Sequence, residues 1–209
     1  MKLYHFPPSP YSRRVLAVAY HLGLDPELVE LSIPKGEHMN PDFVALNPNH
    51  KIPTFVNDDG FTLWESSAIM QYLANKEPGH TLYSDDIKVQ ADINRWMFWD
   101  IAHWSPACGV YVYEYLVKNI LNLGEPDPDE IQKGDELFYR FAEVLDNHLK
   151  GRDWLIAKDV TLADYAVGSF LDHAEVAHMP IDNFEQIQRW YANIASLEAW
   201  QRSAPSNFM

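Results

Sequence analysis

The chain has 209 residues, enough for one large domain or two small ones with a buried core. Its formal charge of -14 argues against nucleic acid or an anionic membrane surface as a partner, because binding to phosphates depends on clustered Lys and Arg. No apolar run approaches the roughly 18 residues that a membrane span needs, and the first residues lack a basic and then apolar export signal. The expected location is therefore the cytoplasm.

Cysteine and histidine usage bears on redox and metal chemistry. Cys108 is the single cysteine, which excludes an intrachain disulfide, a Cys-x-x-Cys redox pair and a zinc site built from cysteines within one chain. Among the nine histidines, His173 and His178 are five residues apart and so do not share one face of a helix. We expect no metal site.

The first 80 residues alternate short strand patterns with helical ones, and the two patterns with a hairpin turn between them are expected to pair as antiparallel strands. The expected strands are residues 3–6, 28–31, 51–56 and 61–64, with helices over 15–22, near 41–46 and from 66 onward.

A turn between the first strand and the first helix carries the leading functional candidate. The stretch Ser9-Pro10-Tyr11-Ser12-Arg13-Arg14-Val15 opens the helix, and the first turn of a helix presents unpaired N–H groups and a partial positive charge. A hydroxyl at Ser9 therefore faces a position suited to an anion such as a thiolate. Ser before a helix is also an ordinary cap, and this stretch alone leaves both interpretations open.

A second helix start, at Glu65-Ser66-Ser67, poses the same choice between capping and ligand binding. In the functional interpretation, Ser66 and its N–H provide a second anion site while Glu65 receives an ammonium group. Pro53 must stand at the start or edge of its strand because proline lacks an N–H, and a cis peptide bond there is one way to turn the backbone sharply.

Beyond Pro78-Gly79-His80 the pattern changes to long helical segments, so we expect one domain over residues 1–79 and a second over 86–209. Residues 86–119 are rich in aromatic side chains, which is more typical of a core, although Tyr111 and Tyr115 could share a face over a cleft. Thr161-Leu162-Ala163-Asp164 is expected to be a capping box at the start of a buried helix, so Asp164→Ala should cost about 1 kcal/mol or more.

Five separated segments together resemble the cytosolic glutathione S-transferase family. They are the Ser9–Val15 turn, the loop Lys35-Gly36-Glu37-His38, the segment Lys51-Ile52-Pro53, the helix start Glu65-Ser66-x-Ala68-Ile69 and the Thr161-x-x-Asp164 box. The first block and the Gly36-Glu37-His38 loop are most similar to the serine-type classes, phi and theta in particular. The resemblance implies a thioredoxin-like N-terminal domain of order βαβαββα, an all-helical C-terminal domain and a homodimer.

The resemblance also implies the roles of single residues. Ser9 matches the catalytic serine, with Ser12 and Tyr4 as alternatives, and Pro53 matches the family's cis-proline. Ile52 would bond the cysteinyl backbone of glutathione. The other implied contacts are Glu65 and Ser66 at the γ-glutamyl end, His38 and Lys51 at the glycine carboxylate, and Tyr11, Trp104, Tyr111 and Tyr115 around an electrophile held between the domains. Lys51 and Ser67 depart from the phi pattern, which usually has Gln and often has Arg there.

The implied activity is transfer of the glutathione thiolate, as co-substrate, to small hydrophobic electrophiles. Two alternatives stay open on the sequence: a non-catalytic module of the same fold that binds apolar ligands or a protein, and a glutathione-dependent peroxidase or disulfide reductase. The frame Ser9-Pro10-Tyr11-Ser12 disfavours thiol-disulfide exchange through this turn, because oxygen stands where a Cys-Pro-Tyr-Cys site has sulfur.

Overall fold

The computed structural model describes residues 1–156 and 158–205, which form two compact units. The first unit comprises Met1–Tyr83 together with the described residues from Leu197 onward, and the second comprises Ser84–Ser196. The two units divide between Tyr83 and Ser84. The sequence assigned the residues after 196 to the helical domain, whereas the described residues from Leu197 to 205 belong to the first unit.

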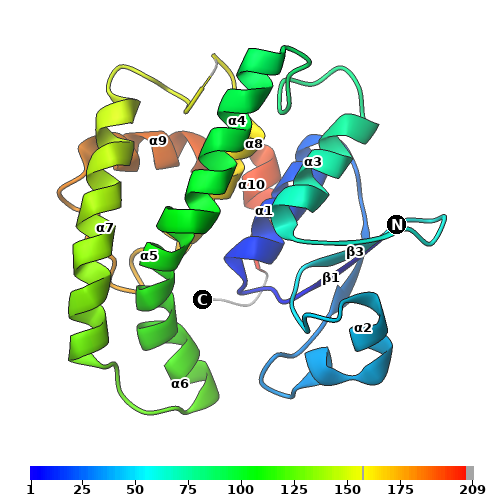
Figure 1. Cartoon of the computed structure of the whole chain (residues 1–209), viewed down its shortest axis with the longest axis horizontal. Coiled ribbons are helices and arrows are strands. Elements are labelled where there is room, and N and C mark those ends of the chain that lie inside the picture. Colours follow the sequence, from blue (N-terminus) through cyan, green and yellow to red (C-terminus); the bar gives the residue numbers. More distant parts are fainter. Residues whose placement is uncertain (157, 206–209) are drawn as a thin grey trace. The chain divides into compact units, whose positions relative to one another are not determined.

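The first unit is built around a four-stranded sheet (Figure 1). Its strands are β1 (Lys2–His5), β2 (Glu27–Glu30), β3 (Thr54–Val56) and β4 (Thr62–Trp64), in the spatial order β2-β1-β3-β4. β1 and β2 are parallel, whereas β3 is antiparallel to both β1 and β4. The antiparallel pairing expected for the last two strands is confirmed. β3 begins only after Pro53, which has no N–H to donate to a neighbouring strand.

The helices of this unit are α1 (Pro10–His21), the 3-10 turn η1 (Glu37–Met39), α2 (Pro41–Leu46), α3 (Ser66–Lys76) and α10 (Glu198–Arg202). With the strands they give the order βαβαββα, which confirms the thioredoxin-like topology. α1 packs against both α3 and α10.

The two faces of the sheet differ in what covers them. Leu3 and Phe55 are paired across β1 and β3, so their side chains share one face, and the Phe55 ring contacts Tyr72 of α3 at 5.7 Å between centroids. Tyr4 points to the other face, because side chains alternate along a strand, and its ring lies 5.7 Å from Phe43 of α2. α3 and α2 therefore lie on opposite faces.

The second unit is all-helical, as expected. It contains α4 (Ile87–Trp99), the π-helical turn η2 (Asp100–Trp104), α5 (Ser105–Tyr111), a second π-helical turn η3 (Val112–Val117), α6 (Lys118–Leu121), α7 (Pro128–Leu149), α8 (Leu162–Gly168), the 3-10 turn η4 (Ser169–His173) and α9 (Glu185–Ala195). α5 packs closely on α7, where a Cβ added at Gly134 would lie 2.8 Å from Val110 Cγ1. A side chain at position 134 would therefore force Val110 to shift.

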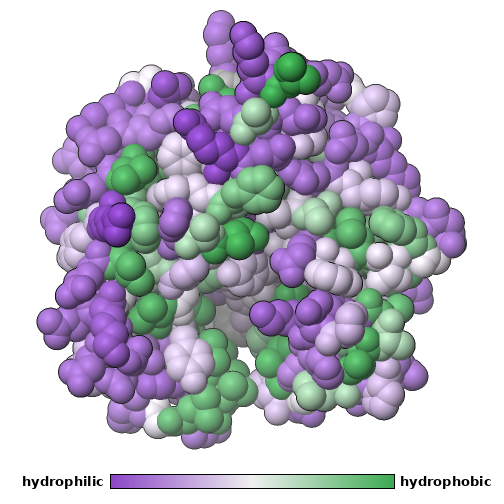
Figure 2. All heavy atoms as spheres, in the orientation of Figure 1, coloured by the Kyte–Doolittle hydropathy of each residue, from purple (hydrophilic) through white to green (hydrophobic). Residues whose placement is uncertain are grey.

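The surface is largely hydrophilic on the face that Figure 2 draws. Hydrophilic residues dominate the outline of the face drawn in Figure 2, and hydrophobic residues gather in smaller groups between them. None of the helices within residues 1–156 and 158–205 combines the length and apolar character needed to cross a bilayer.

Candidate active site

The ends of three strands bring the predicted functional segments together in the first unit. Thr54 at the start of β3 is paired with Tyr4 near the end of β1 and with Trp64 at the end of β4. The turn that follows β1, the Ile52-Pro53 peptide that precedes β3 and the Glu65-Ser66 start of α3 therefore meet at one edge of the sheet. The Ile52-Pro53 bond is cis, as the resemblance implied.

Ser9 is the N-cap of α1. Its backbone is extended (φ -76°, ψ 121°), its N–H donates to Phe6 O at 2.9 Å, and its Oγ accepts from the Ser12 N–H at 3.3 Å. The side chain is half-buried. Within residues 1–156 and 158–205, no acceptor takes the Ser9 hydroxyl hydrogen. The cap therefore uses the oxygen as an acceptor and leaves its O–H able to donate.

The alternative residues Ser12 and Tyr4 are placed differently. Ser12 is 2% exposed and its Oγ accepts from the Phe6 N–H at 3.3 Å, which fastens the turn to the helix. Tyr4 packs on Phe43, on the face of the sheet away from α3. The burial of Ser12 and the orientation of Tyr4 argue against either as the group that meets a ligand sulfur, and Ser9 remains the candidate.

Arg14 links the two helix starts, and the sequence reasoning did not single it out. Its side chain is fully buried, its Nε donates to Ser66 Oγ at 3.0 Å, and its guanidinium lies 4.6 Å from the centroid of the Tyr11 ring. Ser66 is itself 4% exposed. The hydroxyl of Ser66 therefore ties α3 to α1, and Tyr11 is a neighbour of a buried cation. The signal in the sequence is an arginine on the apolar stripe of the first helix.

Glu65 has a backbone conformation that non-glycine residues rarely adopt. Its φ of 71° and ψ of 111° lie just ahead of α3, and its side chain is exposed. Such strain costs of order 1–3 kcal/mol and persists where the surrounding structure imposes it, most often at ligand-binding positions. The sequence left capping and ligand binding open for this turn, and the strained backbone at Glu65 supports ligand binding.

Within the part of the first unit that the structure describes, His38 Nδ1, His50 Nδ1 and Ser67 Oγ are buried without a hydrogen-bond partner. Buried polar atoms in folded proteins are usually paired, so unpaired ones indicate a missing ligand or water. His50, also in the left-handed region at φ 56°, was missed by the sequence reasoning. The polar turn Asn47-Pro48-Asn49-His50 was the available signal.

The backbone of Lys51 helps to fix the loop that precedes β3, and its side chain adds a positive charge. Its carbonyl oxygen accepts from Asn47 Nδ2 at 2.8 Å and from Thr54 Oγ1 at 3.2 Å, so the loop is fixed from inside by Asn47, which is 2% exposed. The ammonium group of Lys51 is on an exposed side chain. An anion bound near this loop would find the Lys51 ammonium group next in sequence to the His50 imidazole.

The predicted electrophile residues of the helical unit require a correction. Trp104 is fully buried, with its Nε1 donating to Val167 O at 3.0 Å, and Tyr111 is 2% exposed, with its hydroxyl donating to Asp135. Burial and the neighbouring carboxylate raise the pKa of Tyr111 far above that of a free phenol. These two side chains are core, because their polar atoms are satisfied inside the unit. Tyr115 is half-buried, edge-on to His178 at 4.7 Å.

No group of three or more His, Cys, Asp or Glu side chains in residues 1–156 and 158–205 is arranged to hold an ion. Cys108 is fully buried, which raises the pKa of its thiol well above the usual value and disfavours the reactive thiolate.

Comparisons with known proteins agree with this geometry. Residues 8–76 match the family model described as "Glutathione S-transferase, N-terminal domain", and residues 102–198 match "Glutathione S-transferase, C-terminal domain". The curated relative "Glutathione S-transferase D7" of Drosophila melanogaster is 30% identical over 209 residues, covering 99% of this chain and 89% of that protein.

Two solved structures extend the similarity to the fold. Glutathione transferase F7 from Populus trichocarpa superposes with a TM-score of 0.91 at 29% identity, covering 99% of both chains. Glutathione transferase BmGSTD1 from Bombyx mori gives 0.80 at 30% identity, covering 93% of this chain and 86% of that one. With both domains matched in order and a relative aligned along nearly its whole length, the chain belongs to the glutathione S-transferase family.

Proposed function

We propose that this protein is a glutathione transferase in which the Ser9 hydroxyl donates a hydrogen bond to the glutathione sulfur and stabilises the thiolate. The observation that carries the proposal is the state of the Ser9 oxygen, which is held at the start of α1 by the Ser12 N–H while its own hydrogen has no described acceptor. A cap of this kind is oriented before the ligand arrives. The thiolate then attacks a small hydrophobic electrophile.

The energetic demand matches this arrangement. A free thiol has a pKa of about 8.5, and lowering it by about two units requires roughly 2.7 kcal/mol of preferential stabilisation. A hydrogen bond to a charged group supplies about 1.5–3 kcal/mol, and a helix N-terminus adds about 0.3–1. The two are sufficient together. Because the Ser12 N–H already donates to Ser9 Oγ, that amide does not stabilise the thiolate. The Ser9 hydroxyl and the helix dipole do.

The remaining glutathione groups have proposed partners on the same edge of the sheet. The Ile52 backbone would pair with the cysteinyl unit, and Glu65 and Ser66 would receive the γ-glutamyl end. The glycine carboxylate would meet His38, Lys51 and, in addition, His50. The unpaired Nδ1 atoms of both histidines support this assignment, since an anionic carboxylate would give each a partner.

The assembly and location are proposed on the family resemblance. A homodimer in the cytoplasm, acting on hydrophobic electrophiles in detoxification, fits what the family implies.

The test compares Ser9→Ala with the wild type, using 1-chloro-2,4-dinitrobenzene as the electrophile. We expect the conjugation rate to fall about tenfold or more, as for the loss of one anion-stabilising donor, while the KM for glutathione stays similar. The pH at which the rate is half-maximal should rise, because the bound thiol then ionises at higher pH. Ser196→Ala, which removes an exposed hydroxyl from the end of α9, serves as the matched control. An unchanged rate and pH profile in Ser9→Ala would contradict the proposal.

A further inference from the structure

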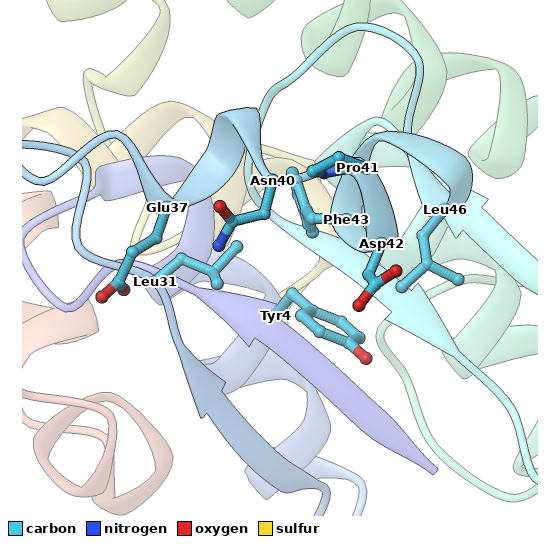
Figure 3. A pocket seen from close by; sticks show the side chains of 8 residues that line it. All are labelled: Tyr4, Leu31, Glu37, Asn40, Pro41, Asp42, Phe43 and Leu46. Atoms are coloured by element: carbon cyan, nitrogen blue, oxygen red, sulfur yellow. The ribbon is translucent and has the colours of Figure 1, made fainter.

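A hollow on the α2 face of the sheet is separate from the residues of the proposed glutathione site. It has a volume of about 470 Å³ and is drawn in Figure 3. The residues that line it are Tyr4, Leu31, Glu37, Asn40, Pro41, Asp42, Phe43 and Leu46. None of them is among the proposed glutathione contacts, and all belong to the first unit.

The floor of the hollow is apolar and aromatic. Tyr4 and Phe43 lie with their ring centroids 5.7 Å apart at an interplanar angle of 49°, and Leu31 and Leu46 flank them. Tyr4 is half-buried, and no hydrogen-bond partner of its hydroxyl occurs within residues 1–156 and 158–205. A half-buried ring beside open space offers its face to a ligand. Figure 2 shows hydrophobic residues next to hydrophilic ones in the region of α2.

The charges at the hollow have one sign. Asp42 and Glu37 are the charged residues that line it, and no basic side chain is among the eight. Figure 3 shows the Asp42 carboxylate on the same side of the hollow as the Tyr4 ring, whereas Glu37 lies at the opposite end. Glu37 Oε2 already accepts from the Ser32 N–H at 2.7 Å, so Asp42 is the less committed carboxylate.

Asp42 has a structural alternative, because an acidic residue in the first turn of a helix interacts favourably with its dipole. That role accounts for the acidic residue but not for the open aromatic floor or the unpaired phenol beside it. The net charge of -14 also favours cations around the molecule over anions.

We propose that this hollow binds a small organic cation with an apolar body, such as an arylalkyl ammonium. The body lies on Tyr4, Phe43 and the flanking leucines, and the ammonium group pairs with Asp42 while facing the Tyr4 ring. A cation over an aromatic face and near a carboxylate is attracted by both. Neutral molecules of the same shape gain only the apolar part.

The experiment uses the full chain and a charge series on one ring: tryptamine, indole and indole-3-acetate. Binding is followed by changes in backbone amide NMR signals of the first unit and by calorimetric titration. We expect saturable binding of tryptamine, with the largest signal changes at Tyr4, Leu31 and Phe43, and an affinity for indole-3-acetate at least about tenfold weaker because its carboxylate meets Asp42.

Two variants test the placement. Asp42→Asn should weaken tryptamine about fivefold or more without changing the indole titration, since only the charge pair is lost. Asn40→Trp should block the hollow, and it removes no capping bond because the Asn40 side chain makes none at the start of α2. Asp85→Asn, an exposed acidic residue of the other unit, is the charge-matched control and should bind like wild type.

Three outcomes would overturn the proposal. The first is the absence of saturable tryptamine binding, and the second is equal affinity for tryptamine and indole-3-acetate, which would leave an apolar hollow without charge selection. The third is displacement of tryptamine by glutathione, which would place the amine at the strand ends beside Ser9. Loss of conjugation in Ser9→Ala bears on the proposed function alone, so the two proposals can fail separately.

Discussion

α1 and α8 each follow an N-cap residue with a side-chain hydroxyl, Ser9 and Thr161, but the two hydroxyl groups are in different environments. At α8, Thr161 is 1% exposed and Asp164 is fully buried, and the capping box between them is complete. At α1, Ser9 is half-buried and its cap uses only the acceptor side of the hydroxyl. The difference teaches that a cap can serve a ligand only where solvent reaches it and one of its hydrogen-bonding groups is still open.

At the start of α8, the Asp164 carboxylate accepts four hydrogen bonds. Its two oxygens accept from the Leu155 N–H at 2.8 Å, the Thr161 N–H at 2.8 Å, the Thr161 hydroxyl at 2.9 Å and Trp190 Nε1 at 2.9 Å. Burial raises the pKa of the Asp164 carboxyl, and these four donors oppose the rise by favouring the ionised form. The box therefore joins a loop, a helix start and α9 through one side chain.

The largest expected effect comes from breaking this buried start. Asp164→Ala should lower the free energy of unfolding by about 3–5 kcal/mol, because it leaves several buried donors without an acceptor. The measurement is urea unfolding of the full chain. Asp159→Ala, at an exposed position of the preceding loop, should shift the midpoint little. A loss below about 1 kcal/mol would mean that the box is no more than an ordinary cap.

The second-largest expected effect concerns the contact between Arg13 of α1 and Trp200 of α10. The Arg13 guanidinium lies 4.2 Å from the centroid of the Trp200 ring, and its Nη2 donates to Trp200 O at 3.3 Å. Trp200→Leu should cost about 2 kcal/mol, since a 2% exposed ring and its contact with a cation are lost. Thermal unfolding measures the loss, with the exposed neighbour Gln201→Leu as control. Equal melting temperatures for the two variants would contradict the prediction that the contact with α10 stabilises α1.

A smaller effect separates capping from donation at Ser9. Ser9→Asp keeps a good N-cap and adds favourable charge at a helix start, so unfolding stability should stay within about 0.5 kcal/mol of wild type. Conjugation should still fall about tenfold or more, because the ionised carboxylate offers no hydrogen and repels the thiolate. Activity retained in this variant would show that the acceptor function alone matters, which would contradict the proposed mechanism.

The smallest effect is a pH dependence at the end of β1. Burial lowers the pKa of His5, with the Glu30 carboxylate acting in the opposite direction. The fold disfavours protonation of His5, whereas the unfolded chain takes up a proton near the ordinary histidine pKa of about 6.5. The contribution of neutral His5 to stability is therefore present above that pH and is lost as the pH falls. In His5→Gln, the drop in the urea midpoint between pH 7.5 and 5 should be smaller. A variant with the wild-type drop would assign the acid sensitivity to other groups.

The candidate site could be predicted from sequence where its residues are local. The serine after β1, the proline before β3 and the acidic residue before α3 each stand at a boundary between elements, and such boundaries are visible as breaks in periodicity. Arg14 and His50 were not predicted as functional, because their importance depends on the Ser66 oxygen and on the burial of an imidazole nitrogen. Trp104 and Tyr111 were assigned to a pocket because aromatic spacing does not distinguish a core from a cleft.

By itself the sequence determined the order of strands and helices, the change of character near residue 80 and the family, because periodicity, turn residues and short motifs are local properties. Tertiary structure alone decided which hydroxyl keeps an open donor, which aromatic rings are core and that the last helix packs on the first unit. Burial and hydrogen-bond partners arise between residues distant in the chain, such as Arg13 and Trp200, and no local pattern encodes them.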